Sequence, residues 1–267
     1  MPEGHTVHRL ARDHHRWFSG QTLDVLSPQG RFSEGAAVLD GGRFVKAFAH
    51  GKHLFYEFNT SETVRWVHIH LGLFGRFKTF RDPERPPTPN VRLRLKAADR
   101  LLDLSGPTCC EILDVPGVKQ VRDRLGPDPL LPQFTGDDCV RSFARRKASV
   151  AAVLMDQAAI AGVGNIFRSE LLFYHRINPD IPAQALREDT VHALWDTAVE
   201  WLTLGVKANA IITTLPAGTL TPPRPRPKEK VAIYKAAHCP RCRGEVDTFS
   251  VRQRTVYACR TCQTRTQ

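Results

Sequence analysis

Four cysteines near the carboxyl end constrain the folding of this chain more tightly than any other feature of its sequence. Cys239 and Cys242 form one C-x2-C pair, Cys259 and Cys262 form a second, and sixteen residues separate the two pairs. This spacing is typical of a zinc site made of four thiolates, which fill the tetrahedron and leave no position for a reacting water. The sequence therefore predicts one Zn²⁺ ion with a structural role.

The segment between the two cysteine pairs predicts a two-stranded ribbon. Residues 249–251 and 255–257 alternate in the manner of strands, and Arg252 and Arg254 lie at the turn between them. A short zinc ribbon with arginines at its tip is suited to reach into a DNA duplex. Because zinc ribbons also serve in protein contacts, the ribbon alone leaves both kinds of partner open.

The net charge points to a polyanionic partner. Thirty-eight Lys and Arg residues against 27 Asp and Glu give a formal charge of +11, a balance that favours nucleic acid. An anionic membrane surface is the competing partner. However, no apolar run approaches the roughly 18 residues that a membrane span requires, and the first residues lack the pattern of a signal peptide. We therefore expect a cytoplasmic protein with no membrane partner.

The other three cysteines, Cys109, Cys110 and Cys139, do not share the metal-like spacing. With an odd total of seven cysteines, a framework of disulfides is not expected. We predict that these three are buried, small apolar residues without a functional role.

A chain of 267 residues exceeds the usual size of one domain, so two or three domains are expected. Short strand-like segments separated by Gly and Pro predict a β-sandwich in the first part, whereas helical periodicity dominates later. The predicted strands are 22–26, 43–49, 53–59, 63–71, 74–80, 91–97 and 100–104, and the predicted helices are 6–18, 149–161, 165–175 and 189–204.

Two proline-rich stretches divide the chain. Residues 125–132 cannot continue a helix or a central strand and are predicted to connect domains. Residues 215–230 alternate Pro with Arg and Lys, which indicates a solvated basic linker. The predicted fold is α+β, with an N-terminal β-sandwich over 1–124, a linker over 125–132, a helical domain over 133–228 and a zinc ribbon over 229–267.

The amino terminus combines a potential nucleophile with an acid. Removal of Met1 would leave Pro2 as the first residue, and its secondary amine would titrate near pH 7.7–8.0. Such an amine can form an iminium ion with a sugar C1′, and Glu3 beside it can supply a proton. A partly dry pocket would raise the pKa of the carboxyl and lower that of the amine. The alternative is that the chain end is frayed and that Pro2 has no functional role.

The motif Gly162-Val163-Gly164-Asn165 stands between two predicted helices. Its glycines permit a tight turn, and the following helix would present free amides and its positive dipole end to a backbone phosphate. An ordinary turn between helices is the other interpretation, and these residues do not decide between them. Glu170 lies on a helix face that we expect to be buried, where a carboxylate requires a cation or an amine as partner.

Several residues have unremarkable interpretations when each is taken alone. Lys52 is interpreted as a solvated surface lysine, and Leu73 and Phe74 as core residues. His68 and His70 alternate on one strand face. Because no third ligand is nearby in the sequence, they suit hydrogen bonding better than metal binding.

Taken together and in order, these motifs resemble the formamidopyrimidine-DNA glycosylase and endonuclease VIII family. The resemblance extends from residue 2 to residue 263. It rests on Pro2-Glu3-Gly4, Gly51-Lys52, His70-Leu71-Gly72-Leu73, Leu125-Gly126-Pro127-Asp128-Pro129-Leu130, Gly162-Val163-Gly164-Asn165 and the four terminal cysteines.

The resemblance implies a sandwich flanked by helices, a helical domain containing a helix, two-turn, helix element, and the zinc ribbon, with DNA between the domains. It implies a monomeric, bifunctional DNA glycosylase and AP lyase of base excision repair that acts on double-stranded DNA containing damaged bases or abasic sites. The enzyme would flip the damaged base out of the stack. The Pro2 amine would displace the base, and β- and δ-elimination would then cut the strand.

The resemblance also implies roles for individual residues. Catalytic roles fall to Pro2, Glu3, Lys52 and Arg254; DNA contacts fall to His70, Leu73, Phe74, Lys147, Asn165 and Tyr234; Glu170 supports the amine; and the metal ligands are Cys239, Cys242, Cys259 and Cys262.

The start Pro2-Glu3-Gly4-His5-Thr6-Val7 and Leu73 resemble the endonuclease VIII branch, which implies oxidised pyrimidines as substrates. Removal of oxidised purines is the alternative. A protein that binds damaged DNA without catalysis is a further alternative, which retention of Met1 would favour.

Overall fold

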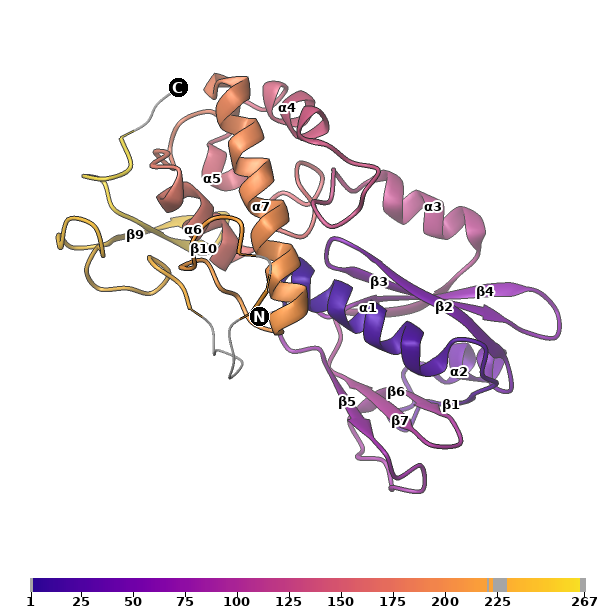
Figure 1. Cartoon of the computed structure of the whole chain (residues 1–267). Coiled ribbons are helices and arrows are strands. Elements are labelled where there is room, and N and C mark those ends of the chain that lie inside the picture. The colour runs from indigo at the N-terminus through magenta and orange to yellow at the C-terminus, as the bar shows by residue number, and fades with distance from the viewer. Residues whose placement is uncertain (1, 220, 223–229, 265–267) are drawn as a thin grey trace. The chain divides into compact units, whose positions relative to one another are not determined.

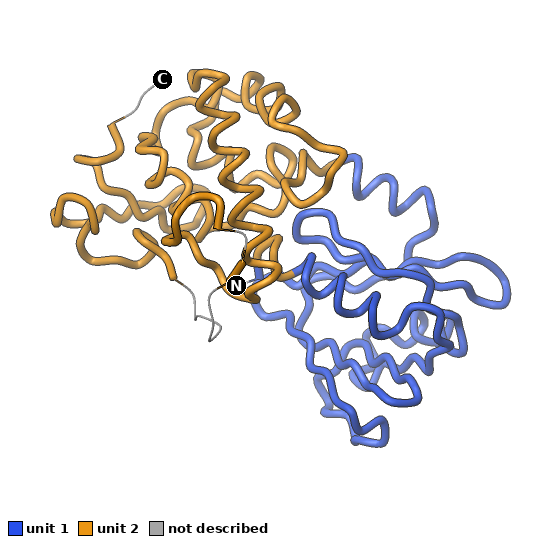
Figure 2. Tube along the Cα trace, in the orientation of Figure 1, with its two compact units in different colours: residues 1–2, 7–123 blue, residues 3–6, 124–267 orange. Residues whose placement is uncertain are grey.

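The computed structural model describes residues 2–219, 221–222 and 230–264, and the chain forms two compact units (Figures 1 and 2). Unit 1 comprises residues 1–2 and 7–123, and unit 2 comprises residues 3–6 and 124–267. Helix α1 (Gly4–Phe18) therefore begins in unit 2 and continues into unit 1.

Unit 1 contains two antiparallel sheets of four strands, with the orders β2-β3-β4-β8 and β1-β6-β7-β5 (Figure 1). The strands are β1 (Asp24–Leu26), β2 (Arg43–His50), β3 (His53–Asn59), β4 (Val64–His70), β5 (Arg76–Phe80), β6 (Val91–Lys96), β7 (Leu101–Ser105) and β8 (Cys109–Leu113). One core receives alternate side chains from both sheets, among them Tyr56 and Val67 from the first and Leu95 and Leu104 from the second. The predicted sandwich is confirmed.

All seven predicted strands are present, with ends within two residues of those expected. Three elements of unit 1 were not predicted: α2 (Ser33–Leu39), β8 and α3 (Val115–Asp123). Each is short, so its sequence contains too few turns or alternations for a period to be recognised. In β8, both Cys109 and Cys110 are only partly buried, which explains the weak alternation of its sequence.

Unit 2 combines helices with a terminal hairpin. Its elements are α4 (Gly136–Ala144), α5 (Val150–Val153), α6 (Asn165–Tyr174), a 3-10 turn (Ala183–Ala185), α7 (Glu188–Ala208), β9 (Asp247–Val251) and β10 (Arg254–Ala258). The ribbon is confirmed, because β9 and β10 pair antiparallel around a turn at Arg252 and Gln253. The buried residue Cys139 belongs to the helical core, as predicted.

The helix predicted over 149–161 was wrong, because α5 has only four residues. After α5 the backbone approaches the predicted linker over residues 125–132. The amide of Gly126 donates to the carbonyl of Gln157, and the side chain of Gln157 binds the amide of Gly162 and the carbonyl of Val163. These bonds replace helical ones, and an Ala-rich sequence gives no sign of them.

No helix of the described residues is long and apolar enough to cross a membrane. In the basic proline-rich stretch, residues 220 and 223–229 lie outside the described residues. Its two ends are held together, because Ile212 and Lys230 form a parallel bridge.

Candidate active site

Glu3 lies at the amino-terminal end of α6, fully buried. Its Oε2 accepts hydrogen bonds from the amides of Gly164, at 2.9 Å, and Phe167, at 3.4 Å. Its Oε1 accepts one from the amide of Ile166, at 2.8 Å. The start of α6 does bind an anion, as one interpretation of the glycine motif required. That anion is a carboxylate of the same chain, so these amides are not free for a phosphate.

The Glu3-Gly4 motif and the Gly162–Asn165 motif approach each other closely because their glycines have no side chains. The amide of Gly4 donates to the carbonyl of Gly162 at 2.8 Å, and a Cβ on Gly4 would lie 2.7 Å from the Cα of Gly162. A Cβ on Gly164 would lie 2.3 Å from Cδ of Glu3. Gly162 has a φ of +92°, which glycine adopts without strain. The Glu3-Gly4 and Gly162–Asn165 motifs are therefore parts of one structure.

The environment of Glu3 favours its ionised form. Three backbone N–H groups point at the carboxylate, and the positive end of the α6 dipole adds to their effect. Pro2, half-buried, is the preceding residue of the chain. A carboxylate that is charged at rest can accept a proton first and release it later.

Arg168 is a buried residue of this region that sequence reasoning did not identify. It is fully buried on α6 and donates to Oδ1 of Asn165 and, at 2.9 Å, to the carbonyl of Thr255 in β10. Burial lowers its pKa to about 10, although the charge of Glu3 opposes this shift, so the guanidinium remains charged at neutral pH. The available signal was an arginine within a helix that is mostly apolar and whose face was expected to be buried.

Glu170, 1% exposed, holds two distant segments together. Its Oε2 accepts from the Thr213 hydroxyl, at 2.6 Å, and from the Ala232 amide, at 2.7 Å. Its Oε1 accepts from the amides of Ile233 and Tyr234, both at 2.8 Å. The expected burial is confirmed, but these four partners are a hydroxyl and three amides instead of a cation. The carboxylate thus clamps both ends of the basic proline-rich stretch.

Glu170→Gln is expected to lower the free energy of unfolding by about 1–3 kcal/mol, because its NH₂ group would face a buried N–H donor. Amide hydrogen exchange should accelerate within residues 232–234, since glutamine keeps one acceptor oxygen and the amides that face its NH₂ group lose theirs. Denaturant unfolding and exchange rates measure both effects. The matched control is Glu188→Gln, an exposed carboxylate of the same unit. Unchanged exchange at 232–234 would contradict the clamp.

In unit 1, Lys52 lies in the turn between β2 and β3, close to His53 and His70. The pKa of His70 is lowered, first by burial and then by the positive charge of Lys52. The pKa of His53 is lowered to about 3, mainly by burial. These imidazoles are therefore neutral at neutral pH, and Lys52 carries the positive charge of this group.

Leu73 and Phe74 form an exposed loop tip between β4 and β5. The core interpretation was wrong for both, since 46% of Leu73 and 82% of Phe74 is exposed. Gly72 has a φ of +64°, and a Cβ on Gly75 would lie 2.3 Å from the carbonyl oxygen of Leu71. This tight turn directs the tip away from the core. Two exposed apolar side chains at a loop tip are suited to enter another molecule.

Three further predicted contact residues lie in unit 2. Lys147 is exposed between α4 and α5. Tyr234 packs edge-on against Tyr257 of β10, with 5.0 Å between ring centroids, and its amide is held by Glu170. Arg254 begins β10, where it is partly exposed.

The four predicted metal ligands converge. All four sulfur atoms lie within 4.8 Å of one another, with Sγ–Sγ distances of 3.8 Å for Cys239–Cys262 and 3.5 Å for Cys242–Cys259. Disulfide bonds are about 2.05 Å long, so these distances exclude them. A tetrahedral zinc ion with bonds of about 2.3 Å separates sulfur ligands by about 3.8 Å. The cluster fits a metal ion of this kind.

Comparison with known proteins gives consistent matches along the chain. Residues 1–106 match the formamidopyrimidine-DNA glycosylase N-terminal domain, and residues 125–216 match the formamidopyrimidine-DNA glycosylase H2TH domain. Endonuclease 8 1 of Mycobacterium tuberculosis is 39% identical, over 99% of this chain and 100% of its own. Formamidopyrimidine-DNA glycosylase of Thermus thermophilus is 30% identical, over 98% and 97%.

Solved structures share the fold. The MutM (Fpg) protein of Thermus thermophilus superimposes with a TM-score of 0.76 and 26% identity over 98% of both chains. The Fpg of Lactococcus lactis, in a complex with DNA containing an abasic site, gives 0.78 with 21% identity over 98% of this chain and 100% of its own.

These matches define the class as DNA glycosylases. The chain belongs to the formamidopyrimidine-DNA glycosylase and endonuclease VIII family, whose members also have AP lyase activity. The predicted family and fold class are thereby confirmed.

Proposed function

We propose that this enzyme removes oxidised pyrimidines from duplex DNA through a Schiff base on Pro2, and then cuts the strand by β- and δ-elimination. The observation that carries the proposal is the fixed position of Glu3 at the start of α6. That anchor orders the chain immediately after Pro2. A chain end held in this way differs from a frayed terminus and can present its amine to a substrate.

In the proposed reaction the Pro2 nitrogen attacks C1′, the bond from C1′ to the base breaks, and the base leaves with a proton delivered by Glu3. Ionised Glu3 first takes a proton from the Pro2 ammonium group, which frees the nitrogen lone pair. The sugar ring then opens at the C1′–O4′ bond, with the nitrogen-bound proton passing to O4′, which leaves an iminium ion at C1′. This iminium ion acidifies C2′, so that elimination can break the 3′ and then the 5′ carbon–oxygen bond. Lys52 contacts phosphate and assists elimination in this proposal.

The choice of pyrimidines rests on sequence similarity. Identity is 39% with endonuclease 8 1 of Mycobacterium tuberculosis but 30% with the Thermus thermophilus formamidopyrimidine-DNA glycosylase. Leu73 agrees with the same branch. In the proposed complex, Leu73 and Phe74 fill the space left by the flipped base, which their exposure supports.

The remaining residues are proposed to hold the DNA backbone and the fold. His70, Lys147, Asn165, Tyr234 and Arg254 contact phosphates in this proposal. Because Oδ1 of Asn165 already accepts from Arg168, a phosphate would be bound by the Asn165 amide NH₂. The four cysteines are proposed to bind one structural Zn²⁺ ion, which the sulfur–sulfur distances support.

One experiment tests the lesion class and the nucleophile together. Duplexes that each carry one oxidised pyrimidine, 8-oxoguanine or an abasic site are scored for cleavage, end chemistry and borohydride trapping. We expect preferential cleavage at oxidised pyrimidines, phosphate at both ends of the gap, and a trapped adduct on Pro2. Preference for 8-oxoguanine would instead indicate the purine branch.

Pro2→Gly and a variant with one extra residue before Pro2 should both lose base release and trapping. The extra residue leaves the proline ring in place but converts its nitrogen to an amide, so it isolates the role of the amine. Intact mass of the wild-type protein establishes whether Met1 is removed. A wild-type adduct on a lysine, with residue 2 unmodified, would exclude the mechanism. Tight DNA binding without cleavage by a protein that retains Met1 would favour the non-catalytic alternative.

A further inference from the structure

A polar cluster occupies one face of the sheet β2-β3-β4-β8 in unit 1. On that face the apolar side chains of Phe55 and Trp66 are covered by Val118 of α3. The same face continues along β3 and β4 with histidines, because side chains two residues apart share a face. His68 follows Trp66 by two residues in β4 and stacks on Phe55, with 5.0 Å between ring centroids.

Strand β8 brings two further donor groups beside His68. In the register of β4 and β8, His68 is opposite Glu111 and His70 is opposite Cys109. Nδ1 of His68 lies 2.8 Å from Oε1 of Glu111 and 3.7 Å from Sγ of Cys109. His68 forms hydrogen bonds, as expected, and its partners on β8 lie more than forty residues away in the chain, where the sequence did not indicate them. Cys109 was expected to be buried but is partly exposed.

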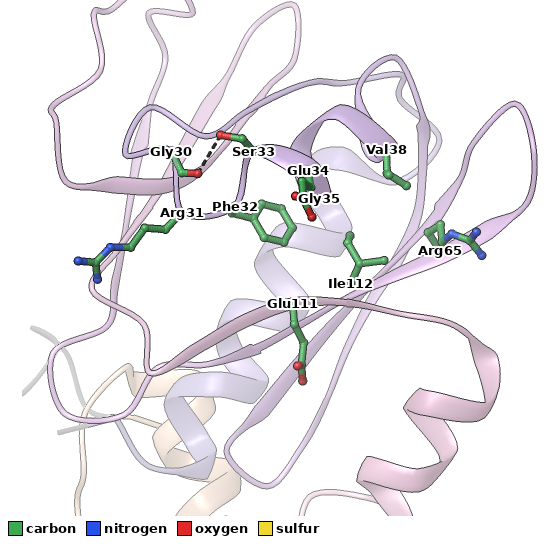
Figure 3. A pocket seen from close by; sticks show the side chains of 10 residues that line it. All are labelled: Gly30, Arg31, Phe32, Ser33, Glu34, Gly35, Val38, Arg65, Glu111 and Ile112. Atoms are coloured by element: carbon green, nitrogen blue, oxygen red, sulfur yellow. Dashed lines mark hydrogen bonds between the residues drawn. The ribbon is translucent and has the colours of Figure 1, made fainter.

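The cluster is open to solvent on the side of Glu111. Its side chain is 49% exposed, whereas that of His68 is 6% exposed. Glu111 and Ile112, neighbours in β8, both line a cavity of about 600 Å³, but their side chains extend from opposite sides of the strand, and that of Ile112 points toward Phe32 and Gly35 (Figure 3). Cys110 likewise packs against the core of the sandwich. An ion in solution can therefore approach the exposed Glu111 and the partly exposed Cys109 without entering the core.

The three donor atoms are spaced as ligands of one ion. A tetrahedral zinc ion, with bonds of about 2.0–2.3 Å, separates a nitrogen from a sulfur ligand by about 3.6 Å and from an oxygen ligand by about 3.3 Å. The observed separations are 3.7 Å and 2.8 Å. Only the exposed carboxylate of Glu111 must move, by about 0.5 Å. Imidazole, thiolate and carboxylate together suit zinc-like ions better than magnesium or calcium, which prefer oxygen ligands.

A second residue fixes the ring of His68. Nε2 of His68 lies 2.8 Å from Nδ1 of His53, and the two rings are stacked with 5.1 Å between centroids. Histidines that bind metal through one nitrogen commonly donate a hydrogen bond through the other, which fixes the tautomer and the ring plane. His53 can accept that bond and leave Nδ1 of His68 for the ion.

We propose that His68, Cys109 and Glu111 form a second metal site, separate from the four cysteines, which binds one divalent zinc-like ion and leaves its fourth position to water. Such an ion links β8, at the edge of the sheet, to β4. Without an ion, the same residues form a chain of hydrogen bonds from Glu111 through His68 to His53.

Cobalt binding tests this site in the full-length protein with its zinc retained. Equilibrium dialysis against Co²⁺ measures the ions bound per chain, and near-ultraviolet absorption reports bonds from cobalt to thiolate. We expect wild type to bind one cobalt ion more than Cys109→Ala, with an absorption band that this variant lacks. Cys110→Ala is the matched control and should bind as wild type does, because that side chain faces the core.

Two further variants keep the test decisive if Cys109→Ala is unstable. Glu111→Gln alters an exposed side chain and should abolish or weaken binding of the additional ion. His53→Phe keeps the stacked ring but removes the acceptor, and should weaken binding by about 10- to 100-fold. Equal cobalt binding by wild type, Cys109→Ala and Glu111→Gln would overturn the proposal, as would loss of the same ion in Cys110→Ala.

Discussion

Glu3→Gln is expected to stop the removal of intact damaged bases while sparing much of the cleavage at preformed abasic sites. A proton donor or acceptor contributes about 10²- to 10⁴-fold to a rate, and the base can leave only slowly without a proton. At an abasic site no base has to leave, and the share of the Pro2 amine that is neutral near its pKa of about 7.7–8.0 can attack C1′ without help from Glu3. The two substrates therefore separate protonation of the leaving base by Glu3 from attack by the Pro2 amine.

The position of Glu3 makes a second effect inevitable. Both of its oxygens accept from backbone amides, those of Gly164 and Phe167 on one side and Ile166 on the other. The NH₂ group of a glutamine would face one of these donors. A buried donor left without an acceptor costs about 1–3 kcal/mol, so the variant should also be less stable by that amount.

Single-turnover rates on a duplex with one oxidised pyrimidine and on the matching abasic duplex measure the catalytic effect, and urea unfolding measures the stability. The control is Glu62→Gln, an exposed carboxylate in the loop between β3 and β4. Rates should be compared well below the unfolding midpoint of the variant. Equal losses on both substrates would contradict the role of Glu3 in protonating the base.

Much of the fold followed from local sequence patterns. The strands of the sandwich, α1, α6 and α7 repeat their apolar period often enough to be recognised. The alternation between the two cysteine pairs predicted the ribbon. The failures were α2, β8, α3 and α4, which are too short for a period, and the region after α5. In that region the carbonyl of Gln157 accepts a hydrogen bond from the amide of Gly126, a long-range contact that no local pattern contains.

The candidate site was predictable only in part, because its elements come from distant segments. For the glycine motif, an anion site and an ordinary turn were both open from the sequence, and the anion considered was a backbone phosphate. Nothing local to it indicated that the anion is Glu3, more than 160 residues earlier. Buried Glu170 was predicted, but its partners depend on how the segments around Thr213 and Ile233 pack. The Cys109 cluster arises from strand register, which sequence periodicity does not provide.

Gly164→Ala is expected to reduce base removal as severely as a change of Glu3 itself. A Cβ at this position would lie 2.3 Å from Cδ and 2.6 Å from Cγ of Glu3, distances that no relaxed structure contains. The backbone of Gly164 is extended, with φ −125° and ψ −162°, so alanine is compatible with its conformation. The added methyl group therefore acts through Glu3, by displacing the carboxylate from the start of α6.

The displacement should also cost stability, since forcing an extra methyl group into a packed site typically costs about 1–3 kcal/mol. A double-mutant cycle with Glu3→Ala isolates the cause. In a chain without the Glu3 carboxylate, alanine at position 164 has room, so its cost should fall by about 0.5–3 kcal/mol. Urea unfolding of the four proteins gives this interaction energy, and excision rates of Gly164→Ala give the catalytic effect. An identical cost in both backgrounds, or wild-type excision by Gly164→Ala, would show that the carboxylate does not depend on this contact.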